Sequence, residues 1–211
     1  LVRHHGQPPG AIITVTPGVQ HAFFAPGDRG GARRAVGLPD DVPVVLFAGR
    51  IQPLKGPDVA IRALAQMEHT DAQLVMIGGA SGVEGAAEAA RMHGLVDDCG
   101  VAGPWDRAAD VVMVPSRSES FGLVALAAAA CGTPVVASAV GGLLSLVDDG
   151  RNGFLVPERT PAAFAAAIDT VLADPAVATS MSMEAAIGAR SYTWASTGQH
   201  LRDVYTDLMR Q

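Results

Sequence analysis

The chain has 211 residues, of which 49% are hydrophobic and 17% are charged, so it can bury a large core and does not have the composition of a disordered protein. Its formal net charge of −6 excludes sequence-independent binding of nucleic acid, because that activity requires a basic surface. The two cysteines, Cys99 and Cys131, have no metal-ligand neighbours at useful spacing, and they predict neither a zinc site nor a disulfide framework. We therefore expect a cytoplasmic protein, and we expect this chain, which starts at Leu1 without a methionine, to be part of a larger one.

Short apolar runs alternate with amphipathic stretches along the whole chain. The runs are rich in β-branched residues and stop at glycine or proline, which predicts strands at 44–48, 73–77, 111–114, 134–137 and 153–156, and a short one near 100–103. Helical periodicity predicts helices at 57–67, 84–93, 122–130, a short one ending at 147, 161–173, 176–190 and 194–209. Apolar strands separated by helices indicate an α/β fold, a Rossmann-like parallel sheet with helices on both faces.

Two cations stand in the loop after the first predicted strand. Ligands of parallel sheets bind at the carboxyl ends of the strands, and the loop Gly49–Gly56 carries Arg50 and Lys55 there, just before a helix. Arginine offers phosphate a fork of donors, lysine offers a point charge, and a helix N-terminus adds partial positive charge. The chain has fourteen arginines and one lysine, so the position of Lys55 is informative. The pattern fits a diphosphate site, and the alternative is a solvated basic loop.

A second polar loop follows the strand at 111–114. It contains Glu119 and Ser120, and Gly122 opens the next helix. Glycine allows an anion close to the main chain, and a carboxylate accepts hydrogen bonds from sugar hydroxyls. The alternative is a loop that caps the helix, with Glu119 complementing the helix dipole. A third cluster combines the tight turn Gly132–Pro134 with Gly141-Gly142, a glycine pair that could admit a ligand close to the main chain.

Taken together and in this order, these motifs resemble the C-terminal half of the family 4 retaining glycosyltransferases, which have the two-domain GT-B architecture. The resemblance covers nearly the whole chain. It is carried by Val15–Val19, Phe24–Gly27, the Arg50/Lys55 loop, Glu119–Leu123, Gly132–Ala137, Gly141-Gly142, Asp149–Val156 and Tyr192–Trp194. Within the family, the stretch Phe47–Pro57 is most similar to the inositol-phosphate glycosyltransferases of mycothiol synthesis.

The resemblance implies a role for each motif. Arg50 and Lys55 would bind the UDP diphosphate and act catalytically by stabilising charge on the leaving group. Glu119 would hold hydroxyls of the donor sugar, expected to be UDP-N-acetylglucosamine, and the stretch Ser120, Phe121, Gly122 and Leu123 would also bind the donor. The acceptor would be a hydroxyl such as that of 1D-myo-inositol 3-phosphate. The chemistry needs no cofactor, but the resemblance implies a Mg²⁺ ion near Asp106, Arg107, Ala109 and Thr133.

The resemblance also implies an organisation in three parts. Residues 1–30 would form a linker with the first strand, 31–190 the nucleotide-sugar-binding domain, and 191–211 a C-terminal helix packing toward an acceptor-binding N-terminal domain that is absent here. With that domain absent, the apolar face of the last helix would be exposed, and the chain alone would not turn over. The full-length protein could form a homodimer.

The sequence departs from the family pattern at two further places. Ala127 stands where the family has a second glutamate, which binds the ribose hydroxyls. The stretch from Gly94 to Val111 is short for a strand and the helix after it. The family's catalytic histidine belongs to the absent domain, and we expect structural or solvated roles for all six histidines of this chain: His4, His5, His21, His69, His93 and His200.

The departures leave two alternatives open. The chain could be a degenerate relative that binds a nucleotide sugar without catalysis or serves as a scaffold. It could also belong to a relative such as a mannosyltransferase that uses GDP-mannose.

Overall fold

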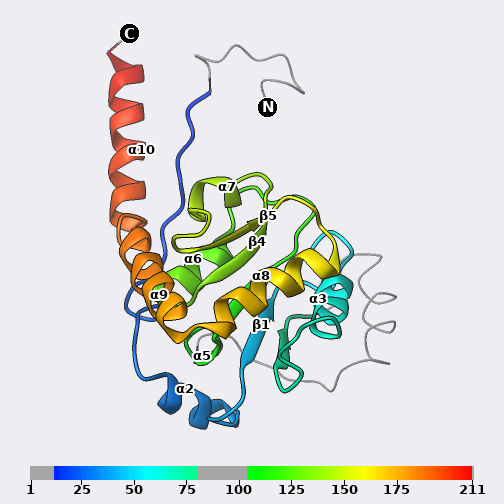
Figure 1. Ribbon diagram of the computed structural model, residues 1–211. Helices are drawn as coiled ribbons and strands as arrows, with labels where there is room; N and C mark the ends of the chain where they lie inside the picture. The colour runs from blue at the N-terminus through cyan, green and yellow to red at the C-terminus, as the bar shows by residue number, and fades with distance from the viewer. Residues whose placement is uncertain (1–11, 80–103, 211) are drawn as a thin grey trace.

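The computed structural model describes residues 12–79 and 104–210. Within them, five parallel strands form one sheet in the order β2-β1-β3-β4-β5 (Figure 1). The strands are β1 Val44–Ala48, β2 Gln73–Ile77, β3 Val111–Val114, β4 Val135–Ser138 and β5 Gly153–Val156. β3 and β4 are buried along their whole length, as strands covered on both faces must be, and this explains their uninterrupted apolar sequence.

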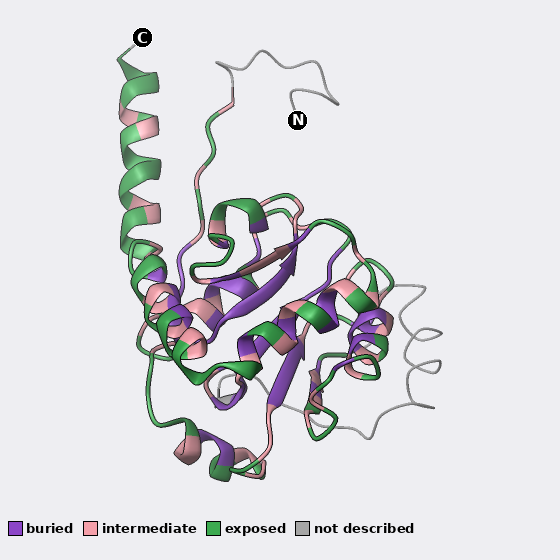
Figure 2. Cartoon of the chain, viewed as in Figure 1, coloured by how far each residue is buried: buried purple, intermediate pink, exposed green. Residues whose placement is uncertain are grey.

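The helices cover both faces of this sheet. They are α2 Arg29–Val36, α3 Pro57–Leu64, α5 Pro104–Ala108, α6 Leu123–Ala130, α7 Leu143–Leu146, α8 Pro161–Ala173, α9 Pro175–Ala189 and α10 Trp194–Met209. On one face, Phe47 packs with residues of α3 and α8, among them the fully buried Phe164. On the other face, Leu46 packs with residues of α5, α6 and α7. Burying each such side chain contributes about 1.5–3 kcal/mol, and the two clusters form the larger part of the core (Figure 2).

The expected α/β fold is confirmed, and most of its elements lie where the sequence predicts them. Four of the five longer strands have the predicted bounds, and the fourth strand is shifted by one residue. The helix predicted over 57–67 ends at Leu64, and tighter i→i+3 turns at Gln66 and Met67 follow it. The helix predicted at 84–93 and the strand near 100–103 lie outside the described residues.

Two helices, α2 and α5, were not predicted, and the described part of the expected first strand is extended chain. The sequence of α2, RGGARRAV, contains two glycines and three arginines, so its intrinsic preference for helix is weak. Residues 12–28 form no strand, although a first strand was expected within 1–30. They make a single bridge, from Val19 to Thr193, because the partner of Val19 is the residue that caps α10 and not a strand of the sheet.

Helix α10 extends away from the body of the protein, beside the segment that starts at residue 12 (Figure 1). Thr193 caps it by accepting a hydrogen bond from the main-chain N–H of Ser196. None of its residues is buried, and Trp194, Tyr205 and Leu208 are exposed, as the sequence predicts (Figure 2). No single helix in the described parts of the chain is long and apolar enough to cross a membrane; α8 and α9 pass that test only as a pair, bent by 101°.

Candidate functional site

The two polar loops predicted from the sequence meet at the carboxyl ends of the neighbouring strands β1 and β3. Lys55 Nζ donates a hydrogen bond to Glu119 Oε2 over 2.5 Å. The same oxygen accepts a hydrogen bond from the hydroxyl of Ser116, over 3.3 Å. The side chains of Lys55 and Glu119 are 21% and 17% exposed, so the pair lies at the surface of the loops and not in the core.

A glycine lets the Lys55 loop approach the Glu119 loop closely. Gly56 precedes α3 with φ +77°, and Pro57 starts the helix, a position where the fixed φ of proline suits the first turn. A Cβ atom on Gly56 would lie 2.5 Å from the carbonyl oxygen of Pro115. One main-chain hydrogen bond also joins the loops directly, from the N–H of Arg117 to the carbonyl of Leu54, over 2.8 Å.

The loop after Glu119 leads into the N-terminus of α6. Gly122 has φ +104°, and no side chain caps the helix. The first N–H groups of a helix lack partners within it, so those of α6 are available to an anionic ligand beside Glu119. Ser120 and Leu123 are exposed, whereas the ring of Phe121 packs on Tyr192, with 5.8 Å between ring centroids.

The pair Gly141-Gly142 packs closely against this loop. A Cβ atom on Gly141 would lie 1.9 Å from the carbonyl oxygen of Glu119, and one on Gly142 would lie 2.3 Å from Cα of Phe121. The N–H of Gly142 donates to the carbonyl of Glu119 over 3.0 Å. The glycines therefore position Glu119 through its main chain, and the approach of a ligand to them stays a prediction.

Arg50 stands apart from the other candidate residues. Its side chain is exposed and makes no hydrogen bond or ion pair with the described residues. The hollow between the loops, lined by Lys55, Ser116 and Glu119, has a volume of about 30 Å³, whereas pockets for small molecules typically measure about 300–1,000 Å³. The hollow is therefore too small to enclose a nucleotide sugar by itself.

A larger hollow lies elsewhere, between α6, α7 and α9, and measures about 540 Å³. It contains none of the residues predicted to bind a donor. Its one cation, Arg151, pairs with Glu184 over 2.8 Å and with Asp148 over 3.5 Å. We therefore place the candidate site at the smaller hollow, where the charges converge from two neighbouring strands.

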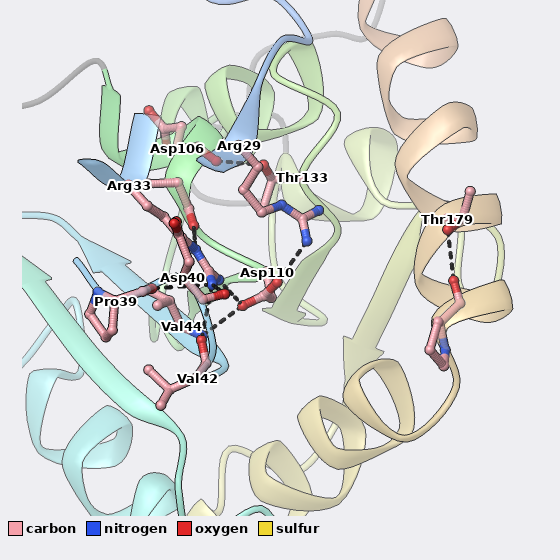
Figure 3. Close-up of polar contacts among 12 residues, drawn as sticks. Arg29, Arg33, Pro39, Asp40, Val42, Val44, Asp106, Asp110, Thr133 and Thr179 are labelled. Atoms are coloured by element: carbon pink, nitrogen blue, oxygen red, sulfur yellow. Dashed lines mark hydrogen bonds and ion pairs between the residues drawn. The ribbon is translucent and has the colours of Figure 1, made fainter. Parts of the chain in front are cut away.

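The residues predicted near Mg²⁺ lie at the opposite, amino-terminal edge of the sheet (Figure 3). Thr133 precedes β4 and donates its hydroxyl proton to the main-chain carbonyl of Asp106, in α5. The side chain of Arg107 points to the carbonyls of Ala25 and Phe23. Asp106 is 7% exposed, and burial raises its pKa from 3.8 to about 6, because a carboxylate away from water is less stable than a neutral carboxyl group.

These residues offer Mg²⁺ only a few oxygen ligands. The cation prefers oxygen ligands in octahedral geometry, usually including one or two carboxylates. Asp106 supplies one carboxylate and Ala109 a main-chain oxygen, and the Thr133 hydroxyl, which donates to the main-chain carbonyl of Asp106, keeps its oxygen lone pairs, so water would have to complete the octahedron. No group of three or more His, Cys, Asp or Glu side chains suited to a metal occurs among the described residues. Magnesium binding stays a prediction, and we assign no step to it.

A second charged cluster occupies the same amino-terminal edge (Figure 3). Arg33 of α2 is 5% exposed, and all three guanidinium nitrogens donate hydrogen bonds. Asp110 accepts from Arg33, from Arg29 over 2.7 Å, and from the N–H of Val44 over 2.7 Å. The remaining bonds of Arg33 go to the main-chain carbonyls of Ala108, Pro39, Asp40 and Val42. This network fastens α2 to the starts of β1 and β3 and explains why so weak a helical sequence folds.

Sequence reasoning missed Ser116, Arg117 and Arg159 at the carboxyl-terminal edge. Ser116 is buried and contacts Glu119, and Arg117 joins the two loops through its main chain. Arg159 donates hydrogen bonds to the carbonyls of Pro115 and Pro53. Ser116 and Arg117 lie within the predicted loop after β3, but Arg159 is 106 residues from Pro53, and no local pattern signals that contact.

Comparison with known proteins identifies the family of the chain. Residues 28–190 match the model of the glycosyl transferases group 1. The D-inositol 3-phosphate glycosyltransferase of Acidothermus cellulolyticus is 45% identical, over all of this chain and 51% of that protein. That alignment runs over 231 positions, against 211 residues here, so the relative contains residues inside the matched region that this chain lacks.

Two solved structures with the same fold are also similar to this chain in sequence. The sucrose-phosphate synthase of Thermosynechococcus elongatus is 35% identical, with a TM-score of 0.82 over 93% of this chain and 52% of that one. Anabaena HepE, solved in complex with UDP and glucose, is 26% identical, with a TM-score of 0.81 over 90% of this chain and 55% of that one. The chain spans about half the length of the curated relatives it matches. It belongs to the group 1 family of glycosyl transferases.

Proposed function

We propose that this chain is the donor-binding half of a retaining glycosyltransferase and that it binds a UDP-sugar at the carboxyl ends of β1 and β3. UDP-N-acetylglucosamine is the proposed donor, and a hydroxyl such as that of 1D-myo-inositol 3-phosphate is the proposed acceptor. The relatives are about twice as long as this chain. The acceptor would bind to a second domain of the kind that accounts for their additional length. The observation that carries the proposal is the meeting of Lys55 and Glu119, from two strands, beside the N-terminus of α6.

The chemistry of these loops suits a nucleotide sugar. Lys55 and Arg50 provide the positive charge that a diphosphate needs, and Glu119 provides an acceptor for sugar hydroxyls. Support also comes from HepE, whose structure contains UDP and glucose, and from the relatives named as D-inositol 3-phosphate glycosyltransferases. In the free chain Lys55 donates one hydrogen bond to Glu119, and the other donors of its ammonium group would be available to the diphosphate.

The proposed reaction forms a bond between the acceptor oxygen and the anomeric carbon of the sugar, on the face from which the UDP departs. The bond from that carbon to the β-phosphate oxygen breaks, and the donor phosphate takes up the acceptor proton. Negative charge grows on the departing diphosphate, where Lys55 and Arg50 would stabilise it. Fixed charges of this kind are often the largest contribution to catalysis.

Calorimetric titration of the 211-residue chain with UDP, GDP and ADP tests the proposal. We expect UDP to bind most tightly of the three, and we expect Lys55→Ala to weaken it about 10–100-fold, because a hydrogen bond to a charged group contributes about 1.5–3 kcal/mol. Arg50→Ala should also weaken UDP binding. The matched control is Arg62→Ala, an exposed arginine in the last turn of α3, which should leave UDP binding unchanged.

Each alternative has its own outcome in this experiment. Tighter binding of GDP than of UDP would support a mannosyltransferase that uses GDP-mannose. No binding of any nucleotide at millimolar concentration would support a scaffold. Ala127, at the position where the family has a ribose-binding glutamate, predicts that UDP binds weakly but measurably. Glycosyl transfer by the 211 residues alone would contradict our proposal that this chain binds the donor and a separate domain binds the acceptor.

A further inference from the structure

Arg159 reaches from the far edge of the sheet to both loops of the donor site. It follows β5, the last strand in the order β2-β1-β3-β4-β5, and precedes α8. Its Nε donates a hydrogen bond to the carbonyl oxygen of Pro115 over 2.5 Å, and its Nη2 donates one to the carbonyl oxygen of Pro53 over 3.4 Å. One guanidinium group therefore bridges the loop after β3 and the loop after β1.

The two carbonyls belong to the segments that carry Lys55 and Glu119. Pro53 lies two residues before Lys55, and Pro115 lies next to Ser116, whose hydroxyl contacts Glu119. The guanidinium is planar and presents its donors in a rigid fork, so it fixes the separation of two acceptors more firmly than a flexible ammonium group can. The separation of the carbonyls in turn governs the relative positions of the Lys55 and Glu119 side chains.

Gly56 shows how closely the guanidinium packs against the Lys55 loop. A Cβ atom on Gly56 would lie 2.2 Å from Nη2 of Arg159. Any side chain at Gly56 would therefore displace Arg159, quite apart from the strain at φ +77°. The residue next to Lys55 is in direct contact with the bridging arginine, and this contact leaves little freedom for the loop to shift.

The charges around Arg159 fit a role at an anion-binding edge. Arg117 and Asp58 both act on its guanidinium, and its pKa is lowered first by burial and then by the neighbouring Arg117. Arginine remains charged in proteins under ordinary conditions. The bridge therefore adds positive charge to the edge that already carries Arg50 and Lys55.

We propose that Arg159 is a positioning residue that clamps the two donor loops together, so that Lys55 and Glu119 face the same bound UDP-sugar. The inference rests on the proposed function, because it concerns the binding of that donor. The clamp acts through the main chain of both loops. Its loss should weaken nucleotide binding without removing any group that touches the nucleotide.

The test is a double-mutant cycle on UDP affinity in the 211-residue chain, by calorimetric titration. Arg159→Ala should weaken UDP binding about tenfold, and Arg159→Lys, which can reach one carbonyl but not both, should weaken it by a smaller factor. In a Lys55→Ala background, Arg159→Ala should weaken UDP binding by less than about twofold. A residue that acts by positioning Lys55 contributes little to affinity when the Lys55 side chain is absent. The control is Arg151→Ala, an exposed arginine in the loop before β5.

The outcomes separate this inference from the proposed function. Measurable UDP binding by the wild-type chain with unchanged binding by Arg159→Ala overturns the clamp alone, and no UDP binding by the wild-type chain overturns both. Equal losses in the wild-type and Lys55→Ala backgrounds, with a melting temperature lowered alike in both, indicate a purely structural role and also overturn the clamp. If Arg159→Ala does not fold, Arg159→Lys and Arg159→Gln provide the same comparison, because both retain the stem of the side chain.

Discussion

The two edges of the sheet use similar ion pairs in different ways. At the amino-terminal edge, Arg33 is 5% exposed and each of its guanidinium nitrogens has an acceptor within the protein. At the carboxyl-terminal edge, Lys55 and Glu119 are 21% and 17% exposed. One hydrogen bond joins them, and Arg50 nearby has no partner among the described residues.

The difference lies in spare hydrogen-bonding capacity. A buried charge whose partners all come from the protein stabilises a structure and offers a ligand nothing. A lysine has three donors, and at Lys55 the bond to Glu119 leaves capacity for phosphate oxygens. Charged residues alone therefore do not locate a site in this fold. A candidate binding site is marked instead by charged residues whose hydrogen-bonding groups are not all satisfied within the protein.

The largest effect should follow from breaking the amino-terminal network. Arg33→Ala leaves Asp110 with Arg29 and the N–H of Val44 as partners and removes the donor to four main-chain carbonyls, and breaking a buried ion pair costs up to about 3–5 kcal/mol. We expect a loss of that size in the free energy of unfolding, measured by urea denaturation. UDP affinity of the folded variant should be unchanged, and a large loss of affinity would show that the two edges are not independent.

Asp106 should make stability depend on pH at the same edge. Its pKa is raised to about 6 in the folded chain, so the folded state holds a proton that the unfolded state releases above about pH 4. The free energy of unfolding therefore falls as the pH rises from about 4 to about 6, by up to about 3 kcal/mol. Asp106→Asn should lose this dependence, measured by denaturation at several pH values.

The same variant separates burial from metal binding. If the free energy of unfolding depends on pH in the same way in the wild-type chain and in Asp106→Asn, the proposed effect of burial on the pKa of Asp106 is contradicted. Stabilisation by millimolar MgCl₂ above pH 6 in the wild-type chain, but not in Asp106→Asn, would support the predicted cation near Asp106.

A smaller effect is expected at the carboxyl-terminal edge. Glu119→Gln keeps an oxygen that can accept from Lys55, but it loses the negative charge of the carboxylate that we propose accepts hydrogen bonds from the sugar hydroxyls. Its affinity for UDP-N-acetylglucosamine should fall about five- to tenfold, which corresponds to about 1–1.4 kcal/mol, while its affinity for UDP should change little. Calorimetry with both ligands measures this. The control is Glu158→Gln, an exposed residue just after β5, and equal losses for UDP and the sugar would refute the assignment.

The smallest effect should come from the residue next to Arg33. Arg34 contacts Asp28 and Asp40 over 3.5 and 3.6 Å, and all three side chains are exposed. Exposed ion pairs contribute little, so Arg34→Ala should change the free energy of unfolding by less than about 0.5 kcal/mol. A loss as large as that of Arg33→Ala would mean that α2 depends on its charges in general and not on the buried network.

The sequence was sufficient for the parts of the fold that depend on local pattern. β1, with its run of buried Val and Leu residues, and α8, with Thr160 and Pro161 at its start, have the predicted bounds. α2 could not be predicted, because its stability comes from contacts of Arg33 with residues up to 77 positions away. Local propensity contains no information about such contacts.

The candidate site also has features that the local sequence predicts and features that only the three-dimensional structure reveals. The loops containing Lys55 and Glu119 could be predicted, because the carboxyl ends of neighbouring parallel strands meet at one edge. The pairing of these two side chains, and the packing of Gly141 against Glu119, required the geometry. Arg159 was missed because its role depends on where β5 lies in the sheet, and strand order is not a local property of the sequence.

The single lysine has a practical consequence for experiments. Lys55 carries the one side-chain amine in 211 residues, and that amine is held by Glu119. An amine-directed acylating reagent can therefore modify only Lys55 and the N-terminal amine, which mass spectrometry of peptides distinguishes. The rate of acylation at Lys55 becomes a readout of the site: Glu119→Gln should speed it, and a bound diphosphate should slow it. The composition of the chain thus provides a built-in reporter of donor binding that needs no engineered label.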